Sequence, residues 1–372
     1  MPSIFSSYRQ RPNQSPATEF FSVSGERQRI DRLIQTSDMA SISILGAGSW
    51  GTALALLLAR NGHSVLLWGH DPGEMQHLRR DRSNQRYLPG IPFPDNLAIT
   101  DDLSVATKAS NLLLIVVPSH AFRHILELLK PWRTAETRIA WATKGLELRT
   151  GHPLHQVVAD VLGETTPAAV LSGPTFAGEV AAGQPTAITV ASESSDLAGQ
   201  LVSMLHNPCF RAYTSPDVIG VELGGAIKNV LAIAAGIADG LGYGANARAA
   251  LITRGLAEMI RLGTALGGRP DTLMGLSGVG DLILTCTDNQ SRNRRFGLGL
   301  GQGRPRETVI AEIGQEIEGI PTAEIVYQLA CRHGIEMPIT EQIHRILREG
   351  LSPAEAVNNL LVRNPKPESA RR

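Results

Sequence analysis

The sequence predicts an α/β domain with a doubly wound, mostly parallel sheet, followed by an all-α domain. Up to about residue 215, short apolar runs alternate with helical patterns, which is typical of a sheet covered by helices on both faces. From about Pro216 the pattern changes to long helices rich in Ala and Gly. The length of 372 residues is sufficient for two domains with substantial cores.

The first element is a strand–turn–helix unit built around three glycines. Residues 41–45 predict a short buried strand, and residues 52–60 predict an apolar helix. Gly46, Gly48 and Gly51 lie between them at the G-x-G-x-x-G spacing of a Rossmann-like dinucleotide-binding fold. The helix N-terminus would offer free N–H groups to a pyrophosphate. We therefore predict a nicotinamide or flavin nucleotide, with a purely structural turn as the alternative.

The second strand, residues 65–68, ends at Gly69, His70 and Asp71. In an NAD-preferring site, an acidic residue at about this point binds the ribose 2′-hydroxyl. A histidine tolerates a 2′-phosphate and an aspartate repels one, so NAD and NADP both remain possible. His70 could equally be a solvated loop residue.

Two further strands bring polar side chains to the carboxyl edge of the predicted sheet, where α/β folds place ligands. The apolar run 112–117 ends in Pro-Ser-His, and strand 138–142 is followed by Thr-Lys-Gly with Lys144 at its centre. Lys144 could pair with a substrate or phosphate, or be merely solvated. A strand from 169 then leads into a turn with Gly173 and Thr175, and another strand spans 186–191.

The second domain opens with one long helical pattern over residues 218–239 that is apolar on nearly every face, as in a central buried helix. Lys228 lies among its apolar residues, where burial would depress the pKa of its ammonium group and suit it to proton transfer. The alternative is a lysine whose stem packs while its head reaches water. A further helix is predicted over residues 247–266.

Beyond these helices, Asp281 and Thr285 have the i, i+4 spacing of one helical face. The segment 291–295, Ser-Arg-Asn-Arg-Arg, gathers three guanidinium groups and is the best local candidate for a phosphate grip, with a solvated basic loop as the alternative. Residues 299–303 are predicted to form a flexible connector, because three of the five are glycine. Helices over 322–333 and 353–363 complete the domain.

Composition limits the partners. Lys plus Arg equals Asp plus Glu at 35 each, so the net charge indicates neither nucleic acid nor an anionic membrane. Three scattered cysteines fit a reducing cytoplasm and argue against a metal site, and no apolar run has the length of a membrane span. We predict a disordered extension over 1–39, a dinucleotide-binding domain over 40–215, a helical substrate and catalytic domain over 216–364, and a flexible tail over 365–372.

Together these stretches resemble the bacterial-type NAD(P)-dependent glycerol-3-phosphate dehydrogenases, from Ile42 to about Arg363. Eight landmarks occur in the order expected for that family: GAGSWG, VPSH, TKG, SGPTFA, ELGGAIKN, GVGDLILTCT, SRNRRFG and GQEIEG. The resemblance implies a Rossmann-like domain and a helical substrate domain with the active site between them. It also implies NAD(H) or NADP(H) as the cofactor, no metal, and a possible homodimer.

The resemblance assigns roles to individual residues. Lys228 matches the catalytic proton-transfer residue. Asn229 and Thr285 match substrate contacts of the related eukaryotic branch. The family commonly has Arg at the position of His70 and Val at that of Glu316. The implied substrate contacts are Lys144, Gly173, Thr175, Lys228, Asp281, Ser291, Arg292 and Asn293. The implied cofactor contacts, besides the three glycines, are Ser49, Trp50, His70, Lys144, Ala177, Arg292, Glu316 and Glu318.

The expected reaction is hydride transfer between a nicotinamide and the C2 carbonyl of dihydroxyacetone phosphate, giving sn-glycerol 3-phosphate for glycerophospholipid synthesis. Two alternatives remain at this stage. One is another NAD(P)-dependent dehydrogenase of the same architecture acting on a hydroxy acid, which would not need the basic segment 291–295. The other is a non-catalytic nucleotide-binding sensor, which would have no reason to bury Lys228.

Overall fold

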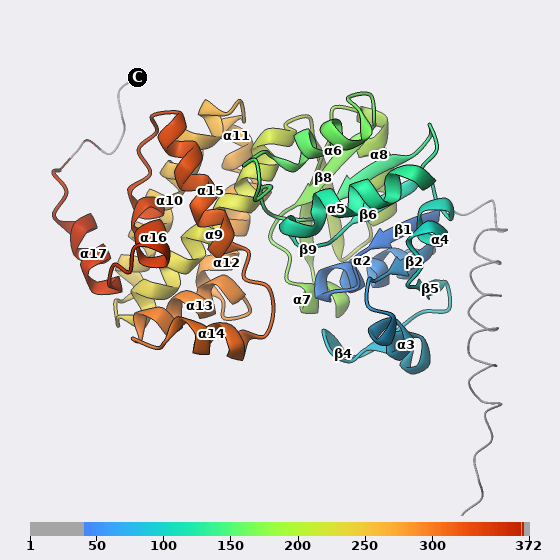
Figure 1. Ribbon diagram of the computed structural model, residues 1–372, viewed down its shortest axis with the longest axis horizontal. Coiled ribbons are helices and arrows are strands. Elements are labelled where there is room, and N and C mark those ends of the chain that lie inside the picture. The colour runs from blue at the N-terminus through green and yellow to red at the C-terminus, as the bar shows by residue number, and fades with distance from the viewer. Residues whose placement is uncertain (1–40, 366, 368–372) are drawn as a thin grey trace, which may run out of the picture.

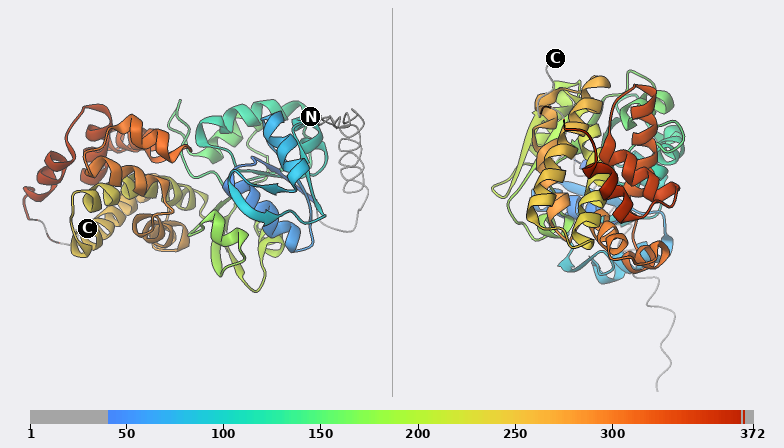
Figure 2. Two further views of the ribbon diagram at one scale, coloured as in Figure 1. Left: turned by 90° about the horizontal axis from the view of Figure 1, so that it is seen from below. Right: turned by 90° about the vertical axis from the view of Figure 1, so that its left-hand side faces the viewer.

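The structure is a computed structural model that describes residues 41–365 and 367. The predicted N-terminal extension and most of the predicted C-terminal tail lie outside these residues. Figures 1 and 2 show a sheet-containing part and a helical part side by side. The predicted fold class, a Rossmann-like doubly wound sheet followed by an all-α domain, is confirmed.

An eight-stranded sheet forms the first part, in the order β10-β9-β8-β7-β6-β1-β2-β5. All neighbouring strands are parallel except β8 and β9, which are antiparallel. The strands are β1 (Ser41–Leu45), β2 (Ser64–Trp68), β5 (Leu97–Thr100), β6 (Leu112–Ile115), β7 (Arg138–Trp141), β8 (Ala168–Ser172), β9 (Thr186–Ala191) and β10 (Phe210–Ser215).

Strand order reverses between β1 and β6, because β2 and β5 lie on one side of β1 and the later strands on the other. In open α/β sheets this crevice, outside the carboxyl ends of the strands, is where ligands bind. The glycine turn after β1 and the Ser119 turn after β6 both open into it.

Helices cover both faces of the sheet, as two separate apolar clusters show. One face is covered by α2 (Ser49–Arg60), α3 (Pro72–Asp81), α7 (Ala177–Ala181) and α8 (Ser195–Leu205). The other is covered by α4 (Leu103–Lys108), α5 (Ser119–Leu129) and α6 (Leu154–Leu162), with the 3₁₀ turn η1 (Lys130–Trp132) after α5. The interiors of β2 and β6 are apolar, as expected for parallel strands buried on both faces, whereas β1 has the buried Ser43 at its centre.

A small hairpin interrupts this alternation after α3. Strands β3 (Ser83–Asn84) and β4 (Leu88–Pro92) pair antiparallel outside the main sheet. Asn84 is buried and donates to the Ala47 carbonyl at 3.0 Å and to Thr52 Oγ1 at 2.8 Å. The hairpin therefore supports the glycine turn from behind.

The helical part is organised around α9 (Val218–Gly240), which matches the predicted central helix. Its length and composition would suit a membrane span, but 89% of its most apolar stretch is buried within the protein. Helices α10 (Ala245–Ala265), α12 (Asp281–Thr287), α13 (Arg292–Gly301) and α15 (Gly319–Arg332) pack around it. The remaining elements are α11 (Pro270–Leu273), the π-helical turn η2 (Leu276–Gly280), α14 (Arg306–Ile313), α16 (Pro338–Arg348) and α17 (Pro353–Leu361).

The prediction of a flexible connector at residues 299–303 is wrong. Gly299 and Gly301 lie inside α13, which packs closely along α9. A Cβ on Gly297 would clash with the Ile233 carbonyl, and one on Gly301 with the Ile237 carbonyl. These glycines allow two helix backbones to approach each other.

Candidate active site

One buried carboxylate, that of Asp281, is the centre of the site. Asp281 is the first residue of α12 and is completely buried. Its Oδ1 accepts a hydrogen bond from Lys228 Nζ at 2.6 Å, and its Oδ2 accepts one from Lys144 Nζ at 2.7 Å. A buried charge is tolerated when it is paired and hydrogen-bonded, and here both oxygens have a cationic donor.

Lys228 is held in one orientation. Its Nζ also donates to Thr285 Oγ1 at 2.9 Å, and the Thr285 hydroxyl in turn donates to the Asp281 carbonyl at 2.6 Å. The i, i+4 spacing places Asp281 and Thr285 on one face of α12, as predicted, and that face contacts Lys228. An ammonium group has three protons, so two fixed partners leave one for a ligand.

Burial lowers the pKa of Lys228 to about 8. The negative charge of Asp281 opposes this shift, whereas the positive charge of Lys144 adds to it. A lysine with a pKa near neutral pH can give up and regain a proton during turnover. The alternative interpretation, a lysine whose head reaches water, is wrong because the whole residue is buried.

Lys144 follows β7 and reaches Asp281 from the sheet side. Its Nζ also donates to the Gly173 carbonyl at 2.8 Å and lies 3.4 Å from Thr175 Oγ1. The half-buried ammonium therefore belongs to the site and is not merely solvated. Lys144, Gly173 and Thr175, which the sequence predicted separately, come together here.

The three arginines of the basic segment 291–295 do not form a single phosphate-binding site. The Ser291 side chain caps α13 by accepting from the Arg294 N–H. Arg294 is buried and points away, pairing with Asp239 and donating to the Cys286 carbonyl at 3.1 Å. Arg295 is exposed. Of the three guanidinium groups, only that of Arg292 is left for the site.

Arg292 is half-buried at the first position of α13. Burial lowers its pKa, and the charges of Glu318 and Glu316 oppose that shift, so these three predicted residues lie near one another. Within residues 41–365 and 367, no hydrogen bond or ion pair holds the Arg292 guanidinium. It is therefore available for an anionic ligand.

The turn between β1 and α2 fits a dinucleotide. Gly46 has φ +127°, and a Cβ there would clash with the Val116 carbonyl, so close approach of two backbones requires glycine. A Cβ on Gly51 would clash with the Gly46 carbonyl, whereas Gly48 has open space where a side chain would be. Gly48 is the N-cap of α2, whose first turn has no side-chain cap. Such a helix end favours phosphate.

A second observation at this turn also points to a ligand. The Trp50 indole Nε1 is buried without a hydrogen-bond partner in the described part of the chain. Buried donors are normally satisfied, so the turn, with Ser49 and Trp50 in the first helical turn, fits a polar ligand. Among the described residues, no group of His, Cys, Asp and Glu could hold a metal ion.

At the end of β2, Asp71 is engaged in local structure. Its carboxylate caps α3 by accepting from the Glu74 N–H at 2.9 Å. His70 is exposed beside it. Only Oδ1 is used, so the exposed carboxylate keeps an acceptor oxygen and its charge. This edge therefore carries one group that repels a 2′-phosphate, Asp71, and one that tolerates it, His70.

Glu318 belongs to the helical part, and its side chain contacts the turn after β6, next to the strand-order reversal. Its carboxylate accepts from the Ser119 N–H at 3.0 Å and from the Ser119 hydroxyl at 2.6 Å, at the first turn of α5. Burial raises the pKa of Glu318, and the two hydrogen bonds from Ser119 oppose that change. Sequence reasoning noted the VPSH turn but missed Ser119, because its partner lies 199 positions away. Glu316 is exposed, and Ala177, the first residue of α7, is partly buried. Among the described residues, neither side chain makes a hydrogen bond at this site.

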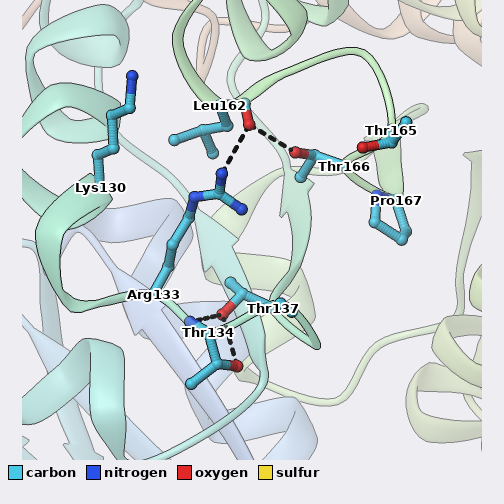
Figure 3. Close-up of a pocket in the computed structure, with 9 residues that line it drawn as sticks. Lys130, Arg133, Thr134, Thr137, Leu162, Thr165, Thr166 and Pro167 are labelled. Carbon is cyan, nitrogen blue, oxygen red and sulfur yellow. Dashed lines mark hydrogen bonds between the residues drawn. The ribbon is translucent and has the colours of Figure 1, made fainter.

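A cavity of about 500 Å³ lies elsewhere, between the loops that precede β7 and β8 (Figure 3). Arg133 donates to the Leu162 carbonyl at 2.8 Å, and that carbonyl also accepts from the Thr166 hydroxyl at 3.2 Å. Because Lys144 follows β7 and these loops precede it, the cavity is at the opposite edge of the sheet. It does not belong to the site around Asp281.

A dinucleotide turn and a buried, pKa-shifted lysine across one crevice define a two-domain, nicotinamide-nucleotide-dependent dehydrogenase. The comparisons agree. Residues 41–198 match the family described as NAD-dependent glycerol-3-phosphate dehydrogenase N-terminus, and residues 217–358 match the C-terminus of the same enzymes. The chain belongs to the NAD-dependent glycerol-3-phosphate dehydrogenase family.

Individual relatives cover nearly the whole described chain. A glycerol-3-phosphate dehydrogenase (NAD(P)+) from Methylococcus capsulatus is 61% identical over 328 residues, which are 88% of this chain and 98% of the relative. One from Aeromonas salmonicida is 58% identical over 333 residues, 89% of this chain and all of the relative. The crystal structure of glycerol-3-phosphate dehydrogenase from Coxiella burnetii has 53% identity and a TM-score of 0.85, covering 87% of this chain and 99% of that one.

Proposed function

We propose that the protein interconverts dihydroxyacetone phosphate and sn-glycerol 3-phosphate with NAD(H) or NADP(H), supplying glycerol 3-phosphate for glycerophospholipid synthesis. The observation that carries the proposal is the pair of lysines, Lys144 and Lys228, on the two oxygens of buried Asp281. Two cations and one carboxylate leave a net positive charge where a carbonyl oxygen would become negative. Family membership supports the same reaction.

A nicotinamide held at the glycine turn would supply the hydride that reduces C2 of the ketone and would take it back in oxidation. Lys228 gives the one proton that its protein partners leave free to the carbonyl oxygen, and so becomes neutral. Lys144 stabilises the charge that develops on that oxygen, and Asp281 keeps both lysines in place. In oxidation, neutral Lys228 accepts the proton of the substrate hydroxyl.

Arg292 is proposed to hold the substrate phosphate, together with Asn293 and the Ser291 region at the start of α13. A guanidinium group recognises phosphate oxygens, and a helix N-terminus favours negative charge. Fixing the phosphate holds C2 at a constant distance from the lysines. The proposed substrate contacts are Lys144, Gly173, Thr175, Lys228, Asp281, Ser291, Arg292 and Asn293.

The nucleotide is proposed to lie along the strand-order reversal, with its pyrophosphate over Gly48 and the first turn of α2. The exposed His70 beside Asp71 tolerates a 2′-phosphate, which supports acceptance of NADP(H) as well as NAD(H). The proposed cofactor contacts are Gly46, Gly48, Ser49, Trp50, Gly51, His70, Lys144, Ala177, Arg292, Glu316 and Glu318.

Three further features belong to the proposal. The domains divide between β10 and α9, at about residues 215 and 216, because the sheet ends there and the helical core begins. The protein acts in the cytoplasm, which the free cysteines Cys209, Cys286 and Cys331 support. It forms a homodimer, and light scattering after size-exclusion chromatography would test this by giving twice the chain mass of 39.9 kDa.

The test is the loss of reduced-nicotinamide absorbance with purified protein and dihydroxyacetone phosphate, run in parallel with NADH and NADPH. We expect turnover with at least one nucleotide, and the ratio of the two kcat/KM values will give the preference. Nucleotide binding without turnover would contradict the proposal and favour either a hydroxy-acid dehydrogenase or a sensor.

A further inference from the structure

Two buried asparagines join three helices, α9, α13 and α15, to the loop after β7 through a chain of hydrogen bonds. The Gly319 N–H donates to Asn293 Oδ1 at 2.9 Å, and Asn293 Nδ2 donates to Asn229 Oδ1 at 2.9 Å. Asn229 Nδ2 then donates to the Lys144 carbonyl at 3.2 Å and to the Gly225 carbonyl at 3.3 Å. We call Asn229, Asn293 and Gly319 the amide relay.

The hydrogen bonds of the amide relay can run in only one donor-to-acceptor direction. Because a backbone N–H can only donate, the side-chain oxygen of Asn293 must face Gly319, and its NH2 group must face Asn229. The oxygen of Asn229 must then face Asn293, so its NH2 group faces two carbonyls. Both amide hydrogens of Asn229 are used, whereas Asn293 keeps one for a ligand. A carboxylate at position 229 would place an oxygen against two carbonyl oxygens.

Both ends of the amide relay return to the sheet side of the crevice. One end is the main chain of Lys144, after β7. At the other end, Gly319 directly follows Glu318, whose carboxylate binds Ser119 after β6. Strands β6 and β7 are neighbours. The relay thus passes through α9 and α13 and closes a ring of contacts around the crevice.

Close packing leaves no room for a side chain at position 319. A Cβ there would lie 2.7 Å from the Asn229 carbonyl oxygen and 2.7 Å from Asn293 Oδ1. These two oxygens belong to the asparagines of the amide relay, Asn229 in α9 and Asn293 in α13. A methyl group added at position 319 would therefore push α15 away from these two helices. This explains a glycine at the first position of a helix where glycine is otherwise unfavourable.

We propose that Asn229, Asn293 and Gly319 are positioning residues that set where Lys144 and Glu318 stand relative to Lys228. The inference rests on the proposed function and extends it to residues whose main contacts are with protein groups. Lys144 shares Asp281 with Lys228, so a shift of its main chain would change the charge distribution at the proton donor. Misplacement by about 1 Å can cost about a hundredfold in rate.

The first test is Asn229→Asp, which keeps the shape and the acceptor Oδ1 but replaces the donor Nδ2 with an acceptor oxygen that faces the Lys144 and Gly225 carbonyls. We expect kcat with dihydroxyacetone phosphate to fall at least about tenfold, whereas the Kd for NADH, from nucleotide fluorescence, stays within about twofold. Asn96→Asp is the matched control, since Asn96 Nδ2 also donates to two carbonyls, those of Ala59 at 2.7 Å and His63 at 2.8 Å, away from the crevice. The control is expected to lower the melting temperature and to leave kcat unchanged.

The second test is Gly319→Ala, which adds no charge. We expect kcat to fall, and the inflection in the pH profile of kcat to move to higher pH as Lys144 shifts away from Lys228. A purely structural role would lower stability without moving that inflection. If Asn229→Asp yields no folded protein, the test rests on Gly319→Ala, for which kcat, the pH inflection and the Kd for NADH are measured in the same way.

Different results would refute the proposed function and the positioning role of the amide relay. A wild-type protein without turnover would refute the proposed function. An active wild type whose folded variants keep kcat and the pH inflection would refute the relay alone.

Discussion

Lys144 and Lys228 come from opposite sides of the crevice and donate to opposite oxygens of Asp281, at 2.7 and 2.6 Å. One residue follows a strand of the sheet and the other lies in the central helix of the helical part. The active arrangement therefore exists only when the two parts are packed together. It also places the two positive charges close enough for Lys144 to lower the pKa of Lys228.

The variant Lys228→Ala tests the role of the proton donor. We expect kcat to fall by about a hundredfold to ten-thousandfold, because general acid catalysis contributes about that factor. The Kd for NADH should remain nearly unchanged, since the glycine turn lies on the other side of the crevice. Stopped-flow turnover and fluorescence titration measure the two quantities. Unchanged kcat would remove Lys228 from the chemistry.

The pKa of Lys228 predicts opposite pH profiles for the two directions. Reduction needs the charged lysine, so kcat/KM should be level below about pH 8 and fall tenfold per unit above it. Oxidation needs the neutral lysine, so kcat/KM should rise up to about pH 8 and then level off. Initial rates in both directions over pH 6 to about 10.5 would test this. Parallel profiles for the two directions would contradict the assignment.

Much of this site could be predicted from local sequence. The glycine turn lies between a strand and a helix, and Asp281 and Thr285 share a helical face, so short-range periodicity was sufficient. Lys228 was notable because a lysine within an apolar helix is costly to bury. Periodicity could not predict that the two lysines share one carboxylate, because Asp281 lies 137 positions from Lys144 and 53 from Lys228.

The basic segment shows the same limit. Arg292, Arg294 and Arg295 are alike in sequence, and only the packing of α13 separates them. A helix turns by about 100° per residue, so neighbouring positions face different environments. Arg294 meets the partly buried Asp239 of α9, and Arg295 meets solvent.

This separation predicts different effects for two arginine variants. Arg292→Ala should raise KM for dihydroxyacetone phosphate strongly and leave the melting temperature nearly unchanged, because no protein group pairs with its guanidinium in the described chain. Arg294→Ala should instead destabilise the fold by about 1.5–3 kcal/mol, because Asp239 loses its charged hydrogen bond to Arg294 and keeps only Arg248 as an ion-pair partner. Steady-state kinetics and thermal unfolding would separate the two. Equal KM effects would mean that both arginines bind the substrate phosphate.

The glycines of α13 lead to a paired prediction on stability. Gly297→Ala should destabilise the protein by about 1–3 kcal/mol or more, because its methyl group would clash with the Ile233 carbonyl. Gly199→Ala is the matched control, since Gly199 is an exposed helical glycine of α8 with open space around it. The control should stabilise by roughly 0.4–1 kcal/mol. Chemical denaturation of both variants is the measurement, and equal effects would contradict the close packing of α13.

A buried carboxylate gives the last prediction. Glu258, on α10, accepts from the N–H groups of Ile339 at 2.6 Å and Thr340 at 3.1 Å, and so caps α16, whose own N-cap residue makes no side-chain cap bond. Burial raises the pKa of Glu258 to about 6 from its usual 4.5, although these hydrogen bonds favour the charged form.

Because the folded-state pKa is above the unfolded value, the contribution of this group to stability is complete below pH 4.5 and is lost as pH rises through about 6. The shift corresponds to about 2 kcal/mol in the free energy of unfolding. Glu258→Gln keeps a carbonyl acceptor for the helix end but does not titrate. The difference in unfolding free energy between wild type and variant should therefore change by about that amount between pH 4.5 and 6.5 and be constant above it. A difference that does not vary with pH would mean that Glu258 keeps its charge throughout, with the hydrogen bonds of α16 outweighing the cost of burial.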